Sequence, residues 1–205
     1  MKFFASSLIA GACIGIAAMS YLHLGGLIGA IMFAFGLMAV VWHDLKLFTG
    51  KAQFAWGKQD KRMPRYSYNY GQLLAMLGLN ILGCWLVSFL VVGMTFEISP
   101  DTIVANRISG GILLNGLRAI PCGFIMTLSV KSFKKGVVWP LIFGIPTFII
   151  CAFPHCIADV FYYSTCDTDL LLNNIWMLLG VYVVTIIGNY LGCNLYRSFT
   201  KFNHN

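Results

Sequence analysis

The sequence has 205 residues, of which 59% are hydrophobic and only 10% charged, and its formal net charge is +7. Soluble domains carry about 25% charged residues, so this composition excludes a water-soluble globule and makes the lipid bilayer the expected solvent. Because no basic nucleic-acid-binding signature accompanies the positive charge, we expect no nucleic-acid partner.

Six stretches are long and apolar enough, or nearly so, to cross the hydrocarbon core, which takes about 20 residues. In chain order they are residues 3–22, 24–42, 66–96, 112–130, 136–158 and 170–196. The fourth contains Arg118 and the fifth contains His155. We therefore predict an all-α membrane protein with six transmembrane helices in a single domain, residues 1–205.

The first stretch resembles a secretory signal peptide, because one lysine precedes an apolar run that is followed by small residues. The apolar run continues to Leu22 without a polar cleavage region. This pattern favours a first helix that is retained in the mature protein over a cleaved signal.

The basic residues predict the orientation. If the helices alternate in direction, all of the 14 basic residues except Arg107 and Arg118 fall on one side of the membrane. Basic loops are cytoplasmic, so we expect both termini in the cytoplasm and the protein in the cell (inner) membrane. The segment between the second and third spans contributes Lys58, Lys61, Arg62 and Arg65, whereas the opposite side carries Glu97, Asp101, Asp167 and Asp169.

The seven cysteines fall mostly inside predicted helices, where a free cysteine packs as a small apolar residue. No CxxC pair and no Cys/His ligand spacing is present, so we expect neither a metal nor another cofactor. The four histidines are scattered and no acids are paired, so an enzyme is not expected either.

An internal repeat links the third and sixth spans. LNILGCWLVSF (residues 79–89) and GNYLGCNLYRSF (residues 188–199) share the pattern Asn-x-Leu-Gly-Cys-x-Leu. The copies lie three helices apart, so they point in opposite directions, as in an inverted repeat of three plus three helices. Chance is the alternative, since Leu and Gly are common here, but the shared register favours a first repeat over about residues 1–96 and a second over about 112–199.

Two polar interruptions occupy comparable places in the two halves. HDLKLFTGK (residues 43–51) follows the second apolar stretch, and FPHCIAD (residues 153–159) interrupts the fifth. Broken backbone at membrane depth is tolerated only inside protein or beside a water-filled cavity. We therefore predict that helices 2 and 5 are broken, that residues 47–51 and 154–159 are non-helical, and that Thr49 and His155 approach one pathway.

Four motifs in this order and spacing resemble the formate/nitrite transporter family. LFTGK (residues 47–51) resembles its Leu-Phe-Thr-Gly-Asn loop, and FPHCIAD resembles its Phe-Glu-His-Ser-Val-Ala-Asn loop. RAIPCGF (residues 118–124) is similar to its Arg-Gly-Ile-Leu-Cys-Asn-Trp, and GNYLG (residues 188–192) matches its sixth helix. The resemblance covers nearly the whole chain.

The resemblance implies an aquaporin-like protomer in a homopentamer, with one pore in each protomer. It implies passage of small monovalent anions, together with a proton. By position, Leu47, Phe48 and Thr49 would form the cytoplasmic constriction, Phe148 would contribute to the outer apolar constriction, and His155 would be the central pore histidine.

The chain departs from the family pattern around these positions. Pro154 replaces the glutamate before the histidine, and Asp159 replaces the asparagine that closes that motif. Gly123 replaces the fourth-helix asparagine that lies near the histidine. On the other side, Lys46 and Lys51 replace the glutamate and the asparagine that flank the family's Leu-Phe-Thr-Gly.

Four cations are candidates for concentrating anions at the pore mouths: Arg107, together with Arg118, on the outer side, and Lys46 and Lys51 on the inner side. Many family members have a lysine at the outer mouth, and its position falls near Arg107, which we expect in the outer loop before the fourth helix. Lys46 and Lys51 are the inner candidates. An exposed charge of this kind is screened over about 8 Å at physiological ionic strength, so a role for Arg107 predicts salt-dependent uptake.

Several of these residues have plain structural alternatives. His155 could be a hydrogen-bonded packing residue, Phe148 could face lipid, and Lys51 could be an ordinary cytoplasmic anchor. Asp159 could cap the second half of the fifth helix, since Asp is a favoured N-cap.

The sequence thus favours a channel or transporter for small monovalent anions of weak acids, of the formate, nitrite or hydrosulfide class. His155, with an ordinary pKa of about 6.5, would exchange the proton. The alternative is an aquaporin-type pore for a small neutral solute, although the paired Asn-Pro-Ala motifs of that family are absent.

Overall fold

The computed structural model describes residues 2–54, 68–93 and 98–202, and in these ranges every regular element is a helix. The basic residues Lys58, Lys61, Arg62 and Arg65, and Glu97, lie outside the described residues. The elements are α1 (Lys2–Leu24), α2 (Gly26–Trp42), α3 (Phe48–Lys51), the 3₁₀ turn η1 (Ala52–Phe54), α4 (Tyr70–Gly93), α5 (Asp101–Lys134), α6 (Trp139–Ile150), α7 (Ala158–Thr165), α8 (Thr168–Asn173) and α9 (Ile175–Phe202).

Four of these helices, α1, α4, α5 and α9, are long and apolar enough to cross a membrane. The apolar helices α2 and α6 have only 17 and 12 residues. Helix α2 ends at Trp42, as the sequence predicts, whereas α6 ends at Ile150, well before the end of the fifth predicted stretch, because the chain leaves the helical path before FPHCIAD.

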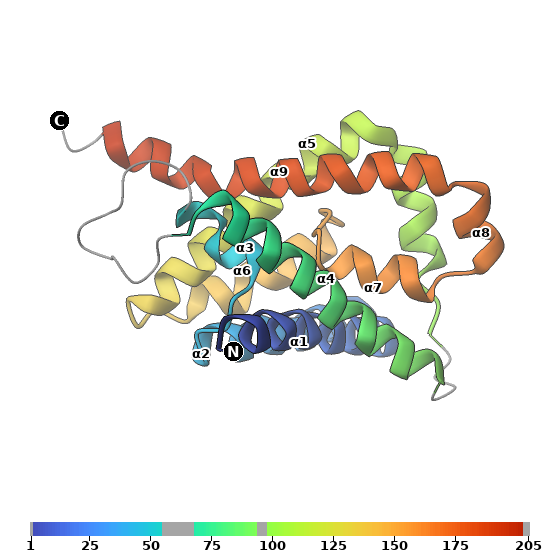
Figure 1. Cartoon of the computed structure of the whole chain (residues 1–205), viewed down its shortest axis with the longest axis horizontal. Coiled ribbons are helices and arrows are strands. Elements are labelled where there is room, and N and C mark those ends of the chain that lie inside the picture. The colour runs from blue at the N-terminus through green and yellow to red at the C-terminus, as the bar shows by residue number, and fades with distance from the viewer. Residues whose placement is uncertain (1, 55–67, 94–97, 203–205) are drawn as a thin grey trace.

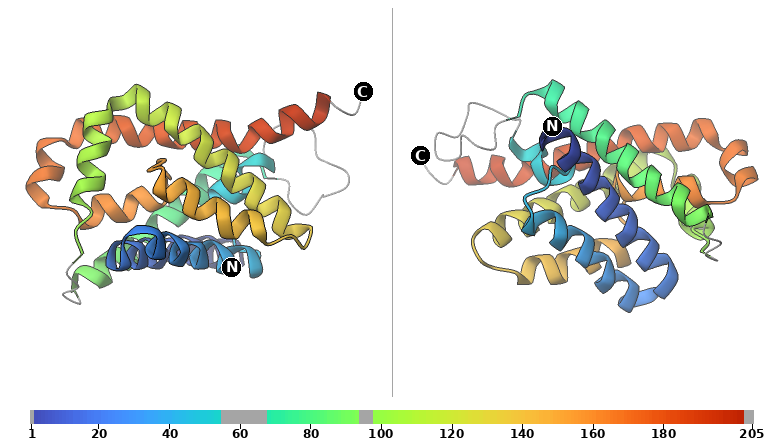
Figure 2. Two further views of the ribbon diagram at one scale, coloured as in Figure 1. Left: turned by 180° about the vertical axis from the view of Figure 1, so that it is seen from behind. Right: turned by 60° about the horizontal axis from the view of Figure 1, so that its bottom comes forward.

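The helices form two outer layers with short segments between them. In Figure 1, α1 and α2 run side by side along one face, and α5 and α9 run along the opposite face. Helix α4 packs on α1, α6 packs on both α2 and α5, and α3 and α7 lie in the interior (Figures 1 and 2). This arrangement buries residues 47–51 and 154–159 inside the protein.

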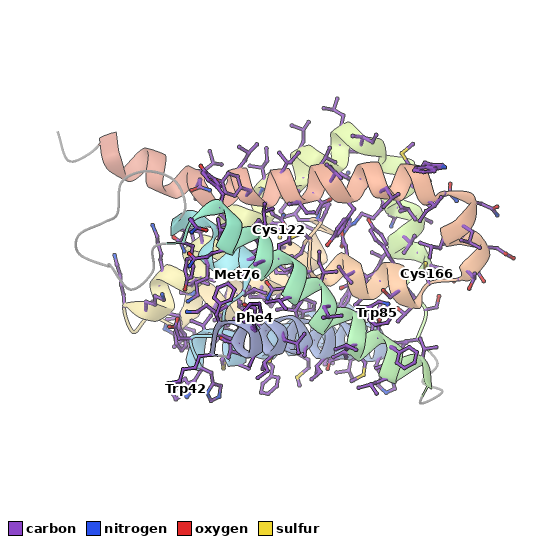
Figure 3. All side chains as sticks on the ribbon, in the orientation of Figure 1. Phe4, Trp42, Met76, Trp85, Cys122 and Cys166 are labelled. Carbon is purple, nitrogen blue, oxygen red and sulfur yellow. The ribbon has the colours of Figure 1, made fainter. Side chains whose placement is uncertain are left out.

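The distribution of side chains fits a lipid environment. Met76 and Cys122 are buried among the helices, whereas Phe4, Trp42 and Trp85 point outward and are strongly exposed (Figure 3). Large apolar side chains with open outer faces cover α1, α2, α4, α5 and α9. Such a surface is stable against lipid or against neighbouring protomers, but not against water.

Helices α2 and α6 end in the same way. Asp44 and Ala152, with φ of 49° and 53°, are the only non-glycine residues with positive φ in the described chain. The next amide reaches back five residues in each case, from Leu45 to the Val40 carbonyl (2.8 Å) and from Phe153 to the Phe148 carbonyl (3.0 Å). This left-handed residue with a long back-bond is a helix C-terminal motif that turns the chain sharply.

Two asparagines hold the chain after these turns. The side-chain oxygen of Asn80 accepts from the Phe48 amide at 2.8 Å, and that of Asn189 accepts from the Cys156 amide at 2.9 Å. Each side-chain amide also donates to two carbonyls, Ser7 and Lys46 for Asn80, and Ala119 and Pro154 for Asn189. Each asparagine thus bonds an amide and a carbonyl at the non-helical segment and ties that segment to a neighbouring long helix, α1 or α5.

Glycines allow close helix contacts between α1 and α4 and between α5 and α9. A Cβ at Gly83 would overlap the Leu8 carbonyl oxygen, and one at Gly192 would overlap the Ile120 carbonyl oxygen. Gly11 and Gly123 lie equally close to the backbones of Asn80 and Asn189. These helices approach as closely as they do only because no side chain intervenes.

The expected non-helical segments are shorter than the sequence indicates. Residues 43–47 and 151–157 lie between helices, but Phe48–Lys51 form α3, and Ala158 and Asp159 already belong to α7. The prediction of wholly non-helical 47–51 and 154–159 is therefore wrong at these positions. The helices resume early because Asn80 and Asn189 take up amides next to their first turns.

Helix α5 begins earlier than the predicted fourth span. It starts at Asp101 and bends at Gly111, where φ is 65° and ψ is −178°. The Asn115 side-chain amide donates to the carbonyls of Arg107 and Gly111, both at 2.7 Å. Arg107 therefore belongs to this helix, and the prediction that it lies in an outer loop is wrong.

Candidate functional site

Thr49 and His155 meet in the interior. The Thr49 hydroxyl oxygen lies 3.1 Å from His155 Nε2, across 106 residues of sequence. Thr49 belongs to α3, and His155 to the loop between α6 and α7. Both side chains are almost completely buried, at 0% and 1% exposure.

The contacts of the His155 ring determine which nitrogen carries its proton. Nδ1 accepts a hydrogen bond from the Ala158 backbone N–H at 3.2 Å, and a backbone N–H can only donate. In the neutral ring the proton therefore resides on Nε2, which faces Thr49. His155 Nε2–H donates to the Thr49 oxygen, leaving the Thr49 hydroxyl hydrogen for another acceptor.

Apolar side chains surround the Thr49–His155 pair. The Phe148 ring stacks on the His155 ring with centroids 5.7 Å apart and an angle of 29°. Phe33 contacts the same Phe148 ring edge-on at 5.7 Å. Phe148, Leu47 and Phe48 are all buried, so Phe148 does not face lipid. Any polar species that reaches the pair must leave its water behind.

Arg107 forms an ion pair with Asp159. Arg107 Nε donates to one carboxylate oxygen and Nη2 to the other, each at 3.2 Å. The two side chains are 5% and 1% exposed. Nη1 donates to the carbonyl of Ala152 at 2.7 Å, which fixes the guanidinium at the C-terminal turn of α6. Asp159 also lies in the first turn of α7, where a negative charge is favourable.

A pocket of about 40 Å³ joins this ion pair to the histidine. Its wall includes Arg107, Phe148, His155, Asp159 and Tyr162. One water needs about 10–15 Å³ on such a measure, so the pocket holds only a few atoms. Arg118, in contrast, is exposed on the outside of α5 and does not line this pocket.

A second pocket, lined in part by Leu47, contains the charged side chains Asp44, Lys51 and Lys134. Lys51 Nζ donates to Asp44 Oδ1 at 2.6 Å, and Lys134 Nζ lies 4.0 Å from the same oxygen. Lys46 Nζ donates to the Tyr68 hydroxyl at 2.8 Å and lies 5.3 Å from the centre of that ring. Lys51 is buried, so it is not an ordinary exposed anchor.

One departure from the family pattern, Gly123, has a packing reason. Gly123 lies against the Asn189 backbone, where any Cβ would overlap, so an asparagine does not fit there. Pro154 contributes its carbonyl to the Asn189 side-chain amide. Asp159 lines the same pocket as His155, and its carboxylate accepts hydrogen bonds from Arg107.

The sequence patterns missed the roles of Asp44, Lys134 and the two asparagines. Asn80 and Asn189 stood out only as members of a repeat, and that repetition was the available signal for them. Asp44 and Lys134 gave none, because they are far apart in the sequence and meet only through the fold. No group of three or more potential metal-ligating side chains occurs in the described part of the chain.

The comparisons with known proteins agree with this geometry. The helices and the buried polar pair define a multi-pass membrane protein, and the family model described as formate/nitrite transporter matches residues 1–202. The chain therefore belongs to the formate/nitrite transporter family. No curated protein sequence matches it.

Solved structures share the fold at low sequence identity. A structure described as a pentameric formate channel with formate bound superposes with a TM-score of 0.80 at 19% identity, over 98% of this chain and 96% of that one. A structure described as an FNT family ion channel superposes with a TM-score of 0.77 at 16% identity, over 99% and 90% of the two chains.

Proposed function

We propose that the protein is a channel or transporter for small monovalent anions of weak acids, of the formate, nitrite or hydrosulfide class. We further propose that the anion moves together with a proton that His155 exchanges. The observation that carries this proposal is the buried Thr49–His155 pair, at 3.1 Å, enclosed by apolar side chains. The similarity to a formate channel with formate bound supports the class of anion.

The architecture that suits this function is an inverted repeat of three plus three helices over the single domain 1–205, with repeats at about 1–96 and 112–199. The α2–α3 and α6–α7 pairs would be the broken helices 2 and 5 of an aquaporin-like protomer. The matched turns at Asp44 and Ala152 and the matched bonds of Asn80 and Asn189 support this interpretation.

Physical chemistry explains why the anion needs a proton. An ion that enters an apolar constriction loses hydration worth many kcal/mol, whereas a neutral weak acid does not. Leu47 and Phe48 would form the constriction on one side of the pair, and Phe148 the constriction on the other. The Thr49 hydroxyl would donate to the passing oxyanion, because its oxygen is already bonded by His155.

The mouths would concentrate anions by charge. We propose Lys46 and Lys51 for the inner mouth and Arg107 for the outer one. The bidentate bond to Asp159 makes the Arg107 contribution that of a dipole and not of a full charge. Arg107 would therefore orient an anion at close range more than attract it from a distance.

The proposed assembly and location are those that suit such a pore. The similarity to a pentameric formate channel supports a homopentamer with one pore in each protomer. The basic segments support an inner-membrane protein with both termini in the cytoplasm.

Uptake into proteoliposomes tests the proposal. The purified protein should carry formate, nitrite or hydrosulfide at a rate that rises as external pH falls, with alkalinisation of the outside medium. Uptake of glycerol or urea without any anion movement would favour the neutral-solute pore and contradict the proposal.

A further inference from the structure

We propose that Lys51 and Lys134 form a binding site for a small monovalent carboxylate at the mouth beside Leu47, and that the Asp44 carboxylate is its built-in competitor. The inference rests on the proposed function, because its ligand belongs to the substrate class proposed above. The site differs from the Thr49–His155 pair in position and in chemistry.

The contacts show what ligand the lysines accept. Asp44 Oδ1 receives a charge-assisted hydrogen bond from Lys51 at 2.6 Å and lies 4.0 Å from Lys134 Nζ. Lys51 is 4% exposed and Lys134 is 20% exposed, whereas Asp44 is 46% exposed. The cations are thus part of the wall, and the carboxylate approaches them from the open side. A free carboxylate of formate size would occupy the same place.

Asp44 contradicts two local preferences. It adopts the left-handed conformation that follows a helix end, where glycine or asparagine is usual. It also places a negative charge just beyond the C-terminus of α2, where the helix dipole disfavours it by about 0.3–1 kcal/mol. Local rules that are broken in this way are expected at functional positions. The lysines opposite are what makes an acid favourable here.

The pocket around these charges lies beside Leu47, which belongs to the proposed constriction. Leu47, Gly50, Lys51, Val130 and Lys134 line it together with Asp44. Leu47 and Gly50 flank Phe48 and Thr49 in the chain, so an anion bound to Lys51 waits directly outside the constriction. The site would therefore hold an anion at the entrance of the proposed pore.

Positive charge dominates this mouth within the described residues. Lys46, Lys51 and Lys134 all act on Asp44. Burial raises the pKa of the Asp44 carboxyl, but its hydrogen bond to Lys51 and the three lysine charges hold that pKa below its ordinary value. Asp44 is therefore ionised at neutral pH and competes with other anions throughout the physiological range.

Chemical rescue tests the site. Asn tolerates the left-handed conformation and matches Asp in shape, so Asp44→Asn removes the charge with little change to the turn. Without added anion, this variant should melt at a lower temperature than the wild type, since Lys51 loses its charge-assisted hydrogen bond to Asp44. Sodium formate should restore the melting temperature, with a half-effective concentration about tenfold below that of any formate effect on the wild type, because the neutral Asn side chain competes for Lys51 less strongly than the Asp44 carboxylate does.

Three further variants test whether the stabilisation by formate arises at Lys51 and Lys134. Asp169→Asn removes an exposed carboxylate from α8 and should show no formate-specific stabilisation beyond the wild type. Asp44→Asn combined with Lys51→Met should lose the rescue. Lys134→Gln, which changes a less buried residue, should raise the half-effective formate concentration at least about threefold in the Asp44→Asn background, since one of the two cations is lost.

The outcomes separate this inference from the proposed function. An Asp44→Asn protein that folds but gains nothing from formate, beyond the gain of the wild type, would show that Asp44 is only a structural partner of Lys51. If Asp44→Asn does not fold, Lys134→Gln in the otherwise wild-type chain decides, since an unchanged apparent KM for formate at that mouth contradicts the site. Wild-type protein that transports no anion would overturn the proposed function, whatever the melting temperatures show.

Discussion

Arg107 and Asp159, 52 residues apart in the sequence, form a two-bond ion pair in the protein interior. The pair joins α5 to the first turn of α7 and lies in the pocket that reaches His155. It ties the position of the histidine loop to the helix that faces it. Removing either partner should therefore both destabilise the fold around His155 and change the charge in its pocket.

Breaking this pair on one side should be costly. Arg107→Gln leaves the Asp159 carboxylate buried without its cation, and such a loss costs about 3–5 kcal/mol. The double variant Arg107→Gln/Asp159→Asn should recover part of that loss, because no buried charge remains. Thermal melting of the single and double variants measures these losses of stability. A double-variant loss equal to the sum of the two single-variant losses would contradict the pairing.

The salt dependence of the Arg107 variant should be weak. A pair with 5% and 1% exposure is hardly screened by mobile ions. The change in formate uptake on Arg107→Gln should thus be similar at low and high salt, contrary to the expectation for an exposed vestibule cation. A defect that disappears at high salt would indicate that Arg107 faces solvent in the working protein.

The Thr49 hydroxyl should be required for transport. Thr49→Val keeps the shape but removes the donor and the acceptor of the His155 contact, so formate uptake should fall by at least about tenfold, the equivalent of one hydrogen bond of about 1.4 kcal/mol in the transition state. Thr49→Ser retains the hydroxyl and is the matched control, with uptake close to wild type. Equal uptake by the Val and Ser variants would remove the hydroxyl from the mechanism.

The glycines at the helix contacts should not tolerate alanine. Gly83→Ala and Gly192→Ala each direct a methyl group at a carbonyl oxygen of the neighbouring helix, so the helices must separate. We expect loss of the folded protein or a fall of several kcal/mol in stability, read from gel filtration and melting in detergent. Gly78→Ala meets nothing within 4 Å and should be neutral or stabilising.

The Asn189 side chain should hold the histidine loop closed. Asn189→Asp keeps the acceptor for the Cys156 amide but cannot donate to the carbonyls of Ala119 and Pro154. The Pro154 carbonyl, left unpaired, costs about 1–3 kcal/mol, so the loop should open more often, and labelling of buried Cys156 by maleimide should speed up at least about tenfold. Peptide mass spectrometry of the labelled protein measures that rate. Unchanged labelling would show that other contacts close the loop.

The sequence predicted the parts of this structure that local patterns encode. Apolar runs predicted the long apolar helices α1, α4, α5 and α9, and the motifs around Thr49 and His155 predicted the family, which the family model confirms. The non-helical residues 43–47 and 151–157 fall at the predicted polar interruptions, but the lengths of these segments were not predicted. The early restart at Phe48 depends on a hydrogen bond to Asn80, 32 residues away. No local pattern contains such a contact.

The charges were harder to predict than the helices. The sequence pattern placed Arg107 in an exposed loop, because it does not reveal the helical residues that precede the bend at Gly111. It allowed Asp159 to be a helix cap, whereas the structure gives it Arg107 as a partner. Which charges neutralise one another depends on the tertiary fold, and the role of each in transport is a proposal.

The histidine is the centre of the proposed mechanism, and two replacements separate its possible roles. His155→Phe keeps an aromatic ring against Phe148 but removes both nitrogen atoms. His155→Gln retains a hydrogen-bond donor for Thr49 but does not exchange a proton near neutral pH. A residue that only packs would be replaced well by Phe, and one that only donates would be replaced well by Gln.

The most direct measurement is formate uptake with simultaneous recording of external pH, for wild-type, His155→Phe and His155→Gln proteoliposomes between about pH 5 and pH 8, the range in which an ordinary histidine titrates. We predict that the wild type alkalinises the outside medium as formate enters, and that both variants lose this proton-linked uptake. Wild-type rates with unchanged pH dependence in either variant would contradict the proton-exchanging role of His155.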